Sequence, residues 1–141
     1  MLKAVLDTNL FISGLLTTKG NPAKILNRWE AGFFDLVISL PILREIKRVI
    51  LYPKINKRLN WTEVEINEFL LGLAQFSFMV SGESKIDVIK DDPTDNKYLA
   101  CALEGNADYI VTGDQHLLKV KEYKGTKIIP PKEFLEVLKK A

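Results

Sequence analysis

Short, nearly continuous apolar runs recur along the chain, and each is followed by a segment long enough for a helix. The runs cover residues 2–6, 35–38, 109–111 and 127–129. Apolar runs that lack polar alternation are typical of strands buried on both faces, and such strands occur in parallel sheets covered by helices. The pattern therefore predicts a mostly parallel central sheet.

The segments between these strands carry apolar residues at helical spacing. The predicted helices cover residues 22–31, 41–51, a segment opened by Thr62, and 131–140. Thr62 and Glu65 have the spacing of a capping box, and Gly32 fits the end of the first of these helices. The nearly uncharged stretch 69–80 has the length of a buried helix and is too short to span a bilayer. Alternating strands and helices predict an α/β fold with three layers, α/β/α.

The composition is that of one globular domain spanning residues 1–141. Twenty Lys and Arg against 18 Asp and Glu leave a net charge of +2, which points to no class of partner. With one cysteine and one histidine, Cys101 and His116, the chain cannot form an internal disulfide, a cysteine-rich zinc site or a paired-histidine zinc helix. The residues before Asp7 leave no room for the apolar core of a secretory signal. We therefore expect a soluble, cytoplasmic protein that does not bind membranes.

Two acids follow predicted strands directly. Asp7 comes after the strand 2–6, and Asp114 comes after the strand 109–111. In an open parallel sheet the ligand crevice lies at the carboxyl ends of the strands, so these two side chains are candidates for a functional site. The alternative is local: Asp7 can cap the following helix, and Asp114 can complement a helix that Thr112 and Gln115 open with a capping box.

Two further acids belong to predicted helices. Asp95 fits the third position of a helix for which Asp92 is the N-cap and Pro93 the first residue. The acids at 91, 92 and 95 exceed what capping needs, and their repulsion calls for a nearby positive group. Glu45 lies at the border of the buried arc of its helix, where it can face the end of the sheet. An ion pair or a backbone N–H that satisfies Glu45 is the alternative.

Carboxylates that converge on a crevice repel one another, so either their pKa values rise or a hard divalent cation neutralises them. Oxygen ligands without an available Cys or His favour Mg²⁺ or Mn²⁺ over zinc. Such ions clamp phosphoryl oxygens and activate water. The acids therefore indicate hydrolysis of a phosphodiester.

The ordered set of motifs Asp7-Thr8-Asn9, Glu45, Asp95-Asn96 and Thr112-Gly113-Asp114 resembles the four-acid pattern of PIN-domain ribonucleases, over residues 2 to about 129. Segments 99–103 and 107–114 are most similar to toxin components of prokaryotic toxin-antitoxin pairs. The resemblance implies a PIN-like fold and a Mg²⁺ or Mn²⁺ site made by those four acids. It also implies single-stranded RNA as the substrate and a homodimer as the assembly. Because the family also contains processing nucleases, a protein antitoxin as partner stays an open alternative.

Other residues near these motifs have candidate roles. Three of them can orient ligands through hydrogen bonds, namely Asn9, Asn96 and Thr112, although Asn9 and Thr112 fit helix capping equally well. Asp92 is an additional acid that stays open as a ligand. His116, two residues after Asp114, is an alternative proton donor to a leaving group.

Basic residues gather locally although the net charge is small. Six Lys and Arg residues stand between positions 44 and 60, against the single acid Glu45. Arg44, Lys47 and Arg48 belong to the Glu45 helix, and we predict that they contact phosphates of the substrate. A solvated face is the alternative for this run. At the level of function the competing hypothesis is a catalytically inactive PIN-fold module that binds RNA or a protein.

Overall fold

The computed structural model describes the whole chain, residues 1–141. Its elements, in chain order, are β1 (Lys3–Leu6), α1 (Thr8–Leu16), α2 (Asn21–Glu30), β2 (Asp35–Ser39), α3 (Leu40–Ile50), α4 (Pro53–Leu59), α5 (Glu63–Gln75), β3 (Phe78–Val80), the 3₁₀ turn η1 (Pro93–Asp95), α6 (Asn96–Gly105), β4 (Tyr109–Val111), α7 (Gln115–Leu118), β5 (Glu122–Tyr123), β6 (Thr126–Ile129) and α8 (Pro131–Lys140). The predicted α/β class is confirmed. The structure has elements within one or two residues of the predicted strands 2–6, 35–38, 109–111 and 127–129 and of the predicted helices 22–31, 41–51 and 131–140.

Six strands form one sheet in the order β3-β2-β1-β4-β6-β5. Neighbouring strands are parallel except at the β5 edge, where β5 pairs with β6 in the antiparallel sense. The central strand β1 lies between β2 and β4, and Leu6 stands opposite Val111. The predicted mostly parallel sheet is confirmed, because its inner strands are the buried apolar runs of the sequence.

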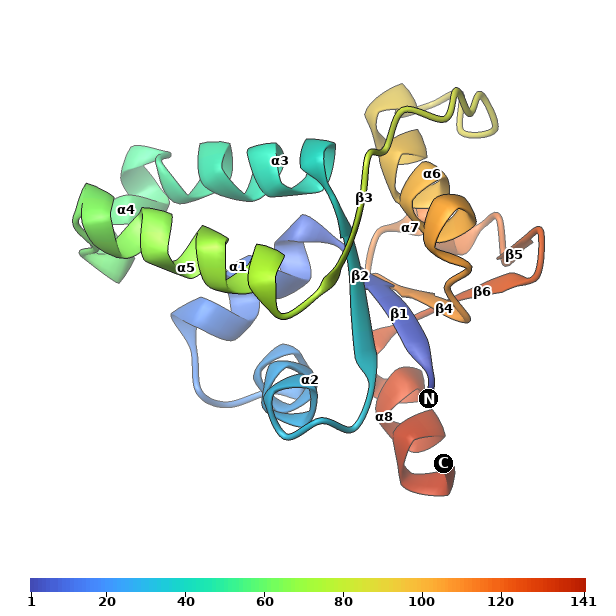
Figure 1. The fold of residues 1–141 in the computed structure, drawn as a ribbon, viewed down its shortest axis with the longest axis horizontal. Coiled ribbons are helices and arrows are strands. Elements are labelled where there is room, and N and C mark those ends of the chain that lie inside the picture. Colours follow the sequence, from blue (N-terminus) through green and yellow to red (C-terminus); the bar gives the residue numbers. More distant parts are fainter.

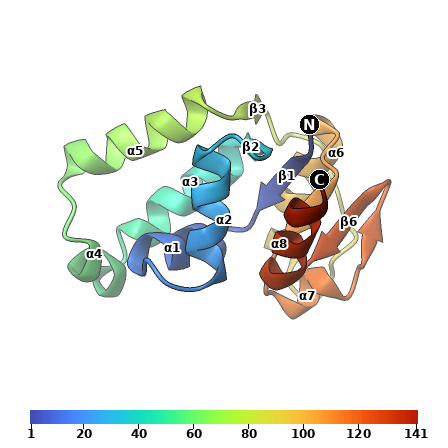
Figure 2. The same ribbon diagram turned by 90° about the horizontal axis from the view of Figure 1, so that it is seen from below.

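Helices cover both faces of the sheet. Figure 1 shows α1 to α5 on one side of β2 and α6 on the other. The chain steps from β1 to β2 to β3 in one direction and then returns through α6 to β4, so right-handed crossovers place α6 on the opposite face. In Figure 2, which views the molecule from below, α4 and the N-terminal end of α5 extend away from the sheet. The predicted three-layer architecture is confirmed.

Helix α3 places one candidate residue at the border of the core. Ile42, Ile46 and Ile50 are fully buried at a spacing of four residues. Glu45 lies beside this stripe with 18% of its side chain exposed. The helix begins where the Ser39 hydroxyl accepts a hydrogen bond from the Ile42 N–H, 3.4 Å away. This start at the end of β2 directs the first turns of α3 over the carboxyl edge of the sheet.

The prediction of a buried helix over residues 69–80 is wrong. Helix α5 ends at Gln75, and the chain continues into the edge strand β3. Phe76, at the end of α5, is 77% exposed. Phe78 is 52% exposed in β3, which has a neighbouring strand on one side only. An uncharged run does not by itself distinguish a helix end from an edge strand. None of the helices is both long enough and apolar enough to cross a lipid bilayer.

Two helix starts also differ from the prediction. The turn η1 precedes α6, and the Asp92 carboxylate accepts a hydrogen bond from the Thr94 hydroxyl, 2.7 Å away, instead of capping a helix. Helix α7 is capped by Asp114 itself, whose Oδ1 accepts from the His116 N–H at 2.7 Å. The capping box predicted from Thr112 and Gln115 does not form, because α7 begins at Gln115, and the Thr112 hydroxyl accepts from the Asp114 N–H and donates to Asp7 instead.

Candidate active site

The carboxyl ends of β1 and β4 lie side by side, because these strands are hydrogen-bonded neighbours. The chain leaves β1 toward β2 on one side and later enters β4 on the other, so the strand order reverses between them. Open α/β sheets bind ligands in the crevice at such a point. Asp7 follows β1 and Asp114 follows β4, so both acids reach this crevice.

Asp7 is buried at the junction of β1 and α1, where it is 5% exposed. Its Oδ1 accepts a hydrogen bond from the Leu10 N–H at 2.8 Å, which caps α1. The other carboxylate oxygen accepts from the Thr112 hydroxyl. Burial raises the pKa of Asp7, these two hydrogen bonds oppose the rise, and the negative charges of Asp114 and Glu45 add to it. Asp7 therefore serves the local cap and also faces the other acids.

Glu45 is bound tightly by hydrogen-bond donors and cations. Its Oε1 lies 2.5 Å from the hydroxyls of both Thr8 and Tyr98, and its Oε2 lies 2.7 Å from Lys97 Nζ. Burial acts to raise the pKa of Glu45, but the hydrogen bonds from Lys97, Thr8 and Tyr98 outweigh it and lower the pKa. Burial also raises the pKa of Tyr98, so this hydroxyl stays a neutral donor. Glu45 is therefore ionised and fixed in position.

Asp95, on η1, has a raised pKa, whereas the pKa of Glu45 is lowered. It is 7% exposed, and its Oδ2 is buried without a hydrogen-bond partner. Burial, together with the charges of Asp114 and Asp92, raises the pKa of Asp95 from 3.8 to about 7, against a smaller opposing effect of Lys97. A carboxylate in this environment needs a proton or a cation.

One cavity of about 180 Å³ is lined by all four predicted acids. The acids that line it are Asp7, Glu45, Asp92, Asp95 and Asp114. They come from the end of β1, from α3, from the region of η1 and from the loop after β4, so the fold brings together residues from distant parts of the sequence. The acids therefore lie in one cavity and not on separate faces of the protein.

A larger cavity of about 560 Å³ lies elsewhere, between α2, the start of β2 and α5. Its lining is mainly apolar and includes Trp29, Phe69 and Phe76. None of the four predicted acids borders it. We place the candidate active site in the smaller cavity, because buried charged groups with shifted pKa values converge there.

Comparison with known families decides the assignment of this fold. The family model described as the PIN domain matches residues 3–116, a span that contains all four acids. The chain belongs to the PIN-domain family. This PIN domain is 35% identical, over 147 residues, to an uncharacterised protein of Methanocaldococcus jannaschii, and the match covers 99% of this chain and 93% of that protein.

The fold of this PIN domain is also similar to a solved structure. The match is to the crystal structure of VapBC2 from Rickettsia felis bound to a DNA fragment from their promoter, with a TM-score of 0.58 and 13% identity. It covers 92% of this chain and 98% of that chain. At this identity the likeness concerns the fold alone.

The three residues predicted to orient ligands have different surroundings in the PIN domain. Thr112 contacts the acids directly, since its hydroxyl donates to Asp7 and accepts from the Asp114 N–H at 2.9 Å. Asn96 holds backbone instead: its side chain bonds the N–H and the carbonyl of Ile89, among other backbone groups. Asn9 is exposed and lines the cavity. Thr112 thus positions Asp7 and Asp114, and Asn96 positions the segment that leads into η1.

Sequence reasoning missed the groups that hold Glu45. Lys97 and Tyr98 lie on α6, and Thr8 begins α1. The excess of acids at 91, 92 and 95 does signal a compensating positive group, and Lys97, two residues after Asp95, is that group in part. Tyr98 carries no comparable signal, because a tyrosine on an apolar helix face is usually a packing residue.

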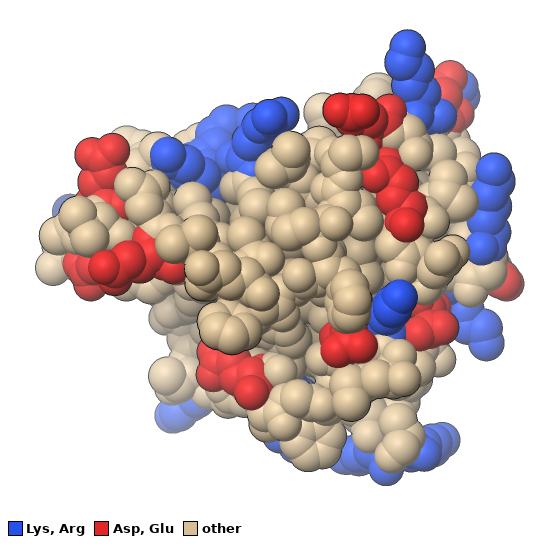
Figure 3. Space-filling view, in the orientation of Figure 1, with Lys and Arg blue, Asp and Glu red and all other residues tan.

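The basic residues of α3 are exposed, and one of them contacts an acid of the cavity. Arg44, Lys47 and Arg48 are exposed, and Arg48 Nη2 lies 3.6 Å from Glu45 Oε2. Figure 3 shows Lys and Arg atoms gathered over α3. Exposed cations of this kind can bind the phosphates of a polyanion, and Arg48 can do so next to Glu45.

The donor set of the PIN domain fits a hard divalent cation. The Lys and Arg ion pairs at the cavity go to Glu45, from Lys97 and Arg48, and leave the aspartates without such a partner. The buried, unpartnered Oδ2 of Asp95 is a ligand atom without a ligand. Carboxylate oxygens are what Mg²⁺ and Mn²⁺ bind. The observed arrangement therefore suits the ion that the sequence predicts.

Proposed function

We propose that this PIN domain is a Mg²⁺- or Mn²⁺-dependent endoribonuclease that hydrolyses phosphodiester bonds of single-stranded RNA. One observation carries the proposal: the carboxylates of Asp7, Glu45, Asp95 and Asp114 share one cavity, and Asp95 Oδ2 is buried there without a partner. Such an excess of buried negative charge is stable when a divalent cation binds. A bound ion would supply water of lowered pKa and would neutralise the scissile phosphate.

The acids have separate roles in this proposal. Asp7, Asp95 and Asp114 would hold the ion, and the Thr112 hydroxyl fixes Asp7 and Asp114 through hydrogen bonds. Glu45 stays ionised because Lys97, Thr8 and Tyr98 donate to it, and it orients the attacking water or contributes a ligand. Attack by water leaves a 5′ phosphate and a 3′ hydroxyl. Since the ribose 2′-hydroxyl takes no part, the chemistry also permits DNA.

The basic side of α3 guides the substrate. Arg44, Lys47 and Arg48 are exposed on the helix that carries Glu45, and Arg48 contacts Glu45, so a strand bound along α3 would bring a phosphate toward the acids. Contacts of this kind release counterions and make RNA binding weaken as salt increases.

The proposal includes partners and location. The similarity to toxin components and the fold likeness to VapBC2 support a protein antitoxin, and the resemblance supports a homodimer. Leu71, Phe76 and Phe78 are more than half exposed, which supports a protein contact on the α5 and β3 side. We place the activity in the cytoplasm. A light-scattering mass tests the dimer, and co-purification with the product of the neighbouring gene tests the antitoxin.

The nuclease proposal is tested by incubating the protein with mixed single-stranded RNAs in Mn²⁺, in Mg²⁺ and in chelator. We expect cleavage with either ion, none in chelator, and none from Asp95→Asn or Asp7→Asn, although both variants still bind RNA. Asp87→Asn is the matched control, because Asp87 is exposed and pairs only with Lys90 at the surface. Cleavage in chelator, or cleavage retained by Asp95→Asn, contradicts the mechanism. RNA binding without any cleavage supports the inactive module.

A further inference from the structure

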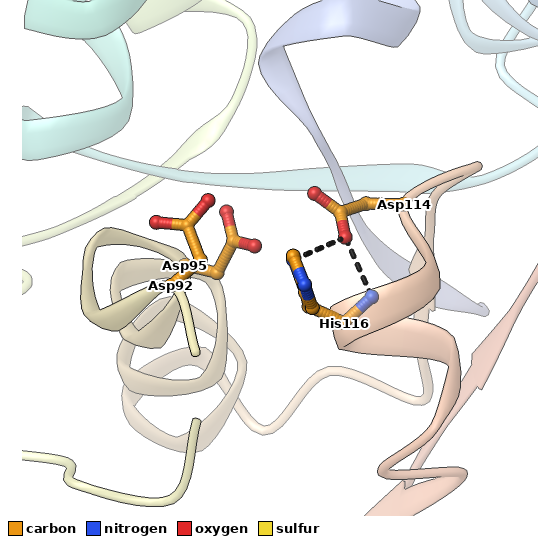
Figure 4. A group of neighbouring side chains, drawn as sticks. All are labelled: Asp92, Asp95, Asp114 and His116. Atoms are coloured by element: carbon orange, nitrogen blue, oxygen red, sulfur yellow. Dashed lines mark hydrogen bonds and ion pairs between the residues drawn. The ribbon is translucent and has the colours of Figure 1, made fainter. Parts of the chain in front are cut away.

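Three of the acids that line the cavity, Asp92, Asp95 and Asp114, form a group with the single histidine of the chain, His116. Asp92, Asp95, Asp114 and His116 each place one potential ligand atom so that all four atoms lie within 4.8 Å of one another. Figure 4 shows Asp92 and Asp95 facing Asp114 and His116 across a narrow gap. The first two belong to the region of η1 and the other two to the start of α7, so the group joins two segments that are distant in the sequence.

The aspartates of this group keep oxygens that the protein does not satisfy. Asp95 is more than nine-tenths buried, and its Oδ2 has no hydrogen-bond partner. The hydrogen bonds that Asp92 and Asp114 accept, from the Thr94 hydroxyl and the His116 N–H, each use one oxygen only. No Lys or Arg pairs with these three aspartates, whereas Lys97 pairs with Glu45. The end of the cavity near His116 is therefore where a cation is needed most.

The imidazole is placed to share such an ion. His116 Nδ1 lies 3.5 Å from Asp114 Oδ1, which is close to the separation of adjacent ligands around one ion. At a ligand distance of about 2.1 Å, opposite ligand atoms around one ion lie about 4.2 Å apart. The four ligand atoms lie within 4.8 Å of one another, so they need to approach by less than about 1 Å to bind one ion. His116 is 42% exposed on its side chain, which leaves the position open to an ion from solvent.

We infer that His116 and Asp92 are direct metal ligands, so that Asp92, Asp95, Asp114 and His116 bind a divalent ion through three oxygens and one nitrogen. The inference rests on the metal site of the proposed function and names two ligands and a metal preference for it. Imidazole nitrogen suits first-row transition ions, whereas Mg²⁺ takes oxygen ligands. The site therefore favours first-row transition ions, Mn²⁺ among them, over Mg²⁺, which revises the all-oxygen ligand set expected from the sequence.

The decisive readout is electron spin echo envelope modulation of the full chain, purified without a histidine tag and loaded with Mn²⁺ alone. Because the chain has one histidine, modulation from a directly bound imidazole nitrogen comes from His116. We expect this modulation in the wild-type protein and its loss in His116→Asn. The wild-type spectrum suffices on its own if that variant fails to fold.

Calorimetric titration supplies the second measurement. His116→Asn and Asp92→Asn should each weaken Mn²⁺ binding by at least about tenfold, by analogy with the loss when groups around a metal are removed. Mg²⁺ binding should change by less than about threefold in His116→Asn, and Asp87→Asn should bind both ions as the wild type does. Bound Mn²⁺ without nitrogen modulation overturns this inference and leaves the proposed nuclease intact. Absence of any Mn²⁺ binding overturns both.

Discussion

Replacement of Asp95 by Asn removes a buried negative charge that lies close to two other aspartates, Asp92 and Asp114. Its effect on stability follows from the structure. The pKa of Asp95 is raised from 3.8 to about 7 in the folded chain, because of burial and the neighbouring Asp114 and Asp92. At about 1.4 kcal/mol per pH unit this corresponds to about 4 kcal/mol. The cavity is open to water, and screening reduces the figure to about 1–2 kcal/mol.

The sign of the effect is fixed by proton linkage. Between pH 4 and pH 7 folded Asp95 holds its proton more firmly than the unfolded chain does, so the free energy of unfolding falls as the pH rises through this range. Its contribution is fully present below pH 3.8 and is lost above about pH 7. Without metal, Asp95→Asn should therefore be more stable than the wild type at pH 8, by about 1–2 kcal/mol, and should lack this part of the pH dependence.

Urea unfolding in chelator at pH 5 and pH 8 measures this difference. A gain of about 1–2 kcal/mol corresponds to a rise in Tm of roughly 3–6 °C for a chain of this size. Addition of Mn²⁺ should then reverse the order, because the wild type gains binding free energy that the variant loses. Equal or lower stability of Asp95→Asn at pH 8 in chelator would contradict a raised pKa of Asp95, and Asp87→Asn should match the wild type throughout.

Three further variants test the role of Glu45, the RNA contact of α3 and the hydrogen bonds of Glu104. Glu45→Gln should abolish RNA cleavage and cost about 1–3 kcal/mol in urea unfolding, because Lys97 is left half-buried without its carboxylate; full cleavage activity would exclude the role given to Glu45. Lys47→Ala should weaken RNA binding and reduce the slope of log affinity against log salt by about one, measured by fluorescence anisotropy, with Mn²⁺ affinity unchanged. In Glu104→Gln the hydrogen bonds from the Gly82 N–H and its neighbours weaken. These hydrogen bonds lower the pKa of Glu104 although burial acts to raise it. Ionised Glu104 therefore adds under about 1 kcal/mol to the free energy of unfolding above the pKa of the unfolded chain, and this stabilisation is lost in acid. The wild type and Glu104→Gln should therefore converge in unfolding free energy as the pH falls below 4.

Four of the six strands were predictable from the sequence. The buried runs of β1, β2, β4 and β6 lack polar alternation, and that property alone identifies a parallel sheet with helices on both faces. The edge strands β3 and β5 escaped prediction for the same reason: they are two or three residues long, and they are partly exposed. Stretch 69–80 shows the limit, because an apolar run was divided between the end of α5 and β3 by tertiary contacts that sequence periodicity does not contain.

The candidate site was predictable to the extent that strand ends determine positions. Asp7 and Asp114 follow adjacent strands, so the parallel sheet alone brings them to one crevice. Lys97 and Tyr98 could not be foreseen as donors to Glu45, because their contact depends on how α6 packs near α3. The proximity of His116 to Asp92 was equally hidden, since it depends on the path of the segment before η1, which Asn96 holds in place.

In the proposed function, acids from distant parts of the chain share a divalent ion. Anomalous diffraction at the manganese edge, from crystals grown with Mn²⁺, tests it directly. We predict an anomalous peak in the cavity, about 2.0–2.6 Å from carboxylate oxygens of both Asp95 and Asp114. A protein saturated with Mn²⁺ that shows no peak in this cavity, or a peak bound only by acids outside it, would contradict the claim.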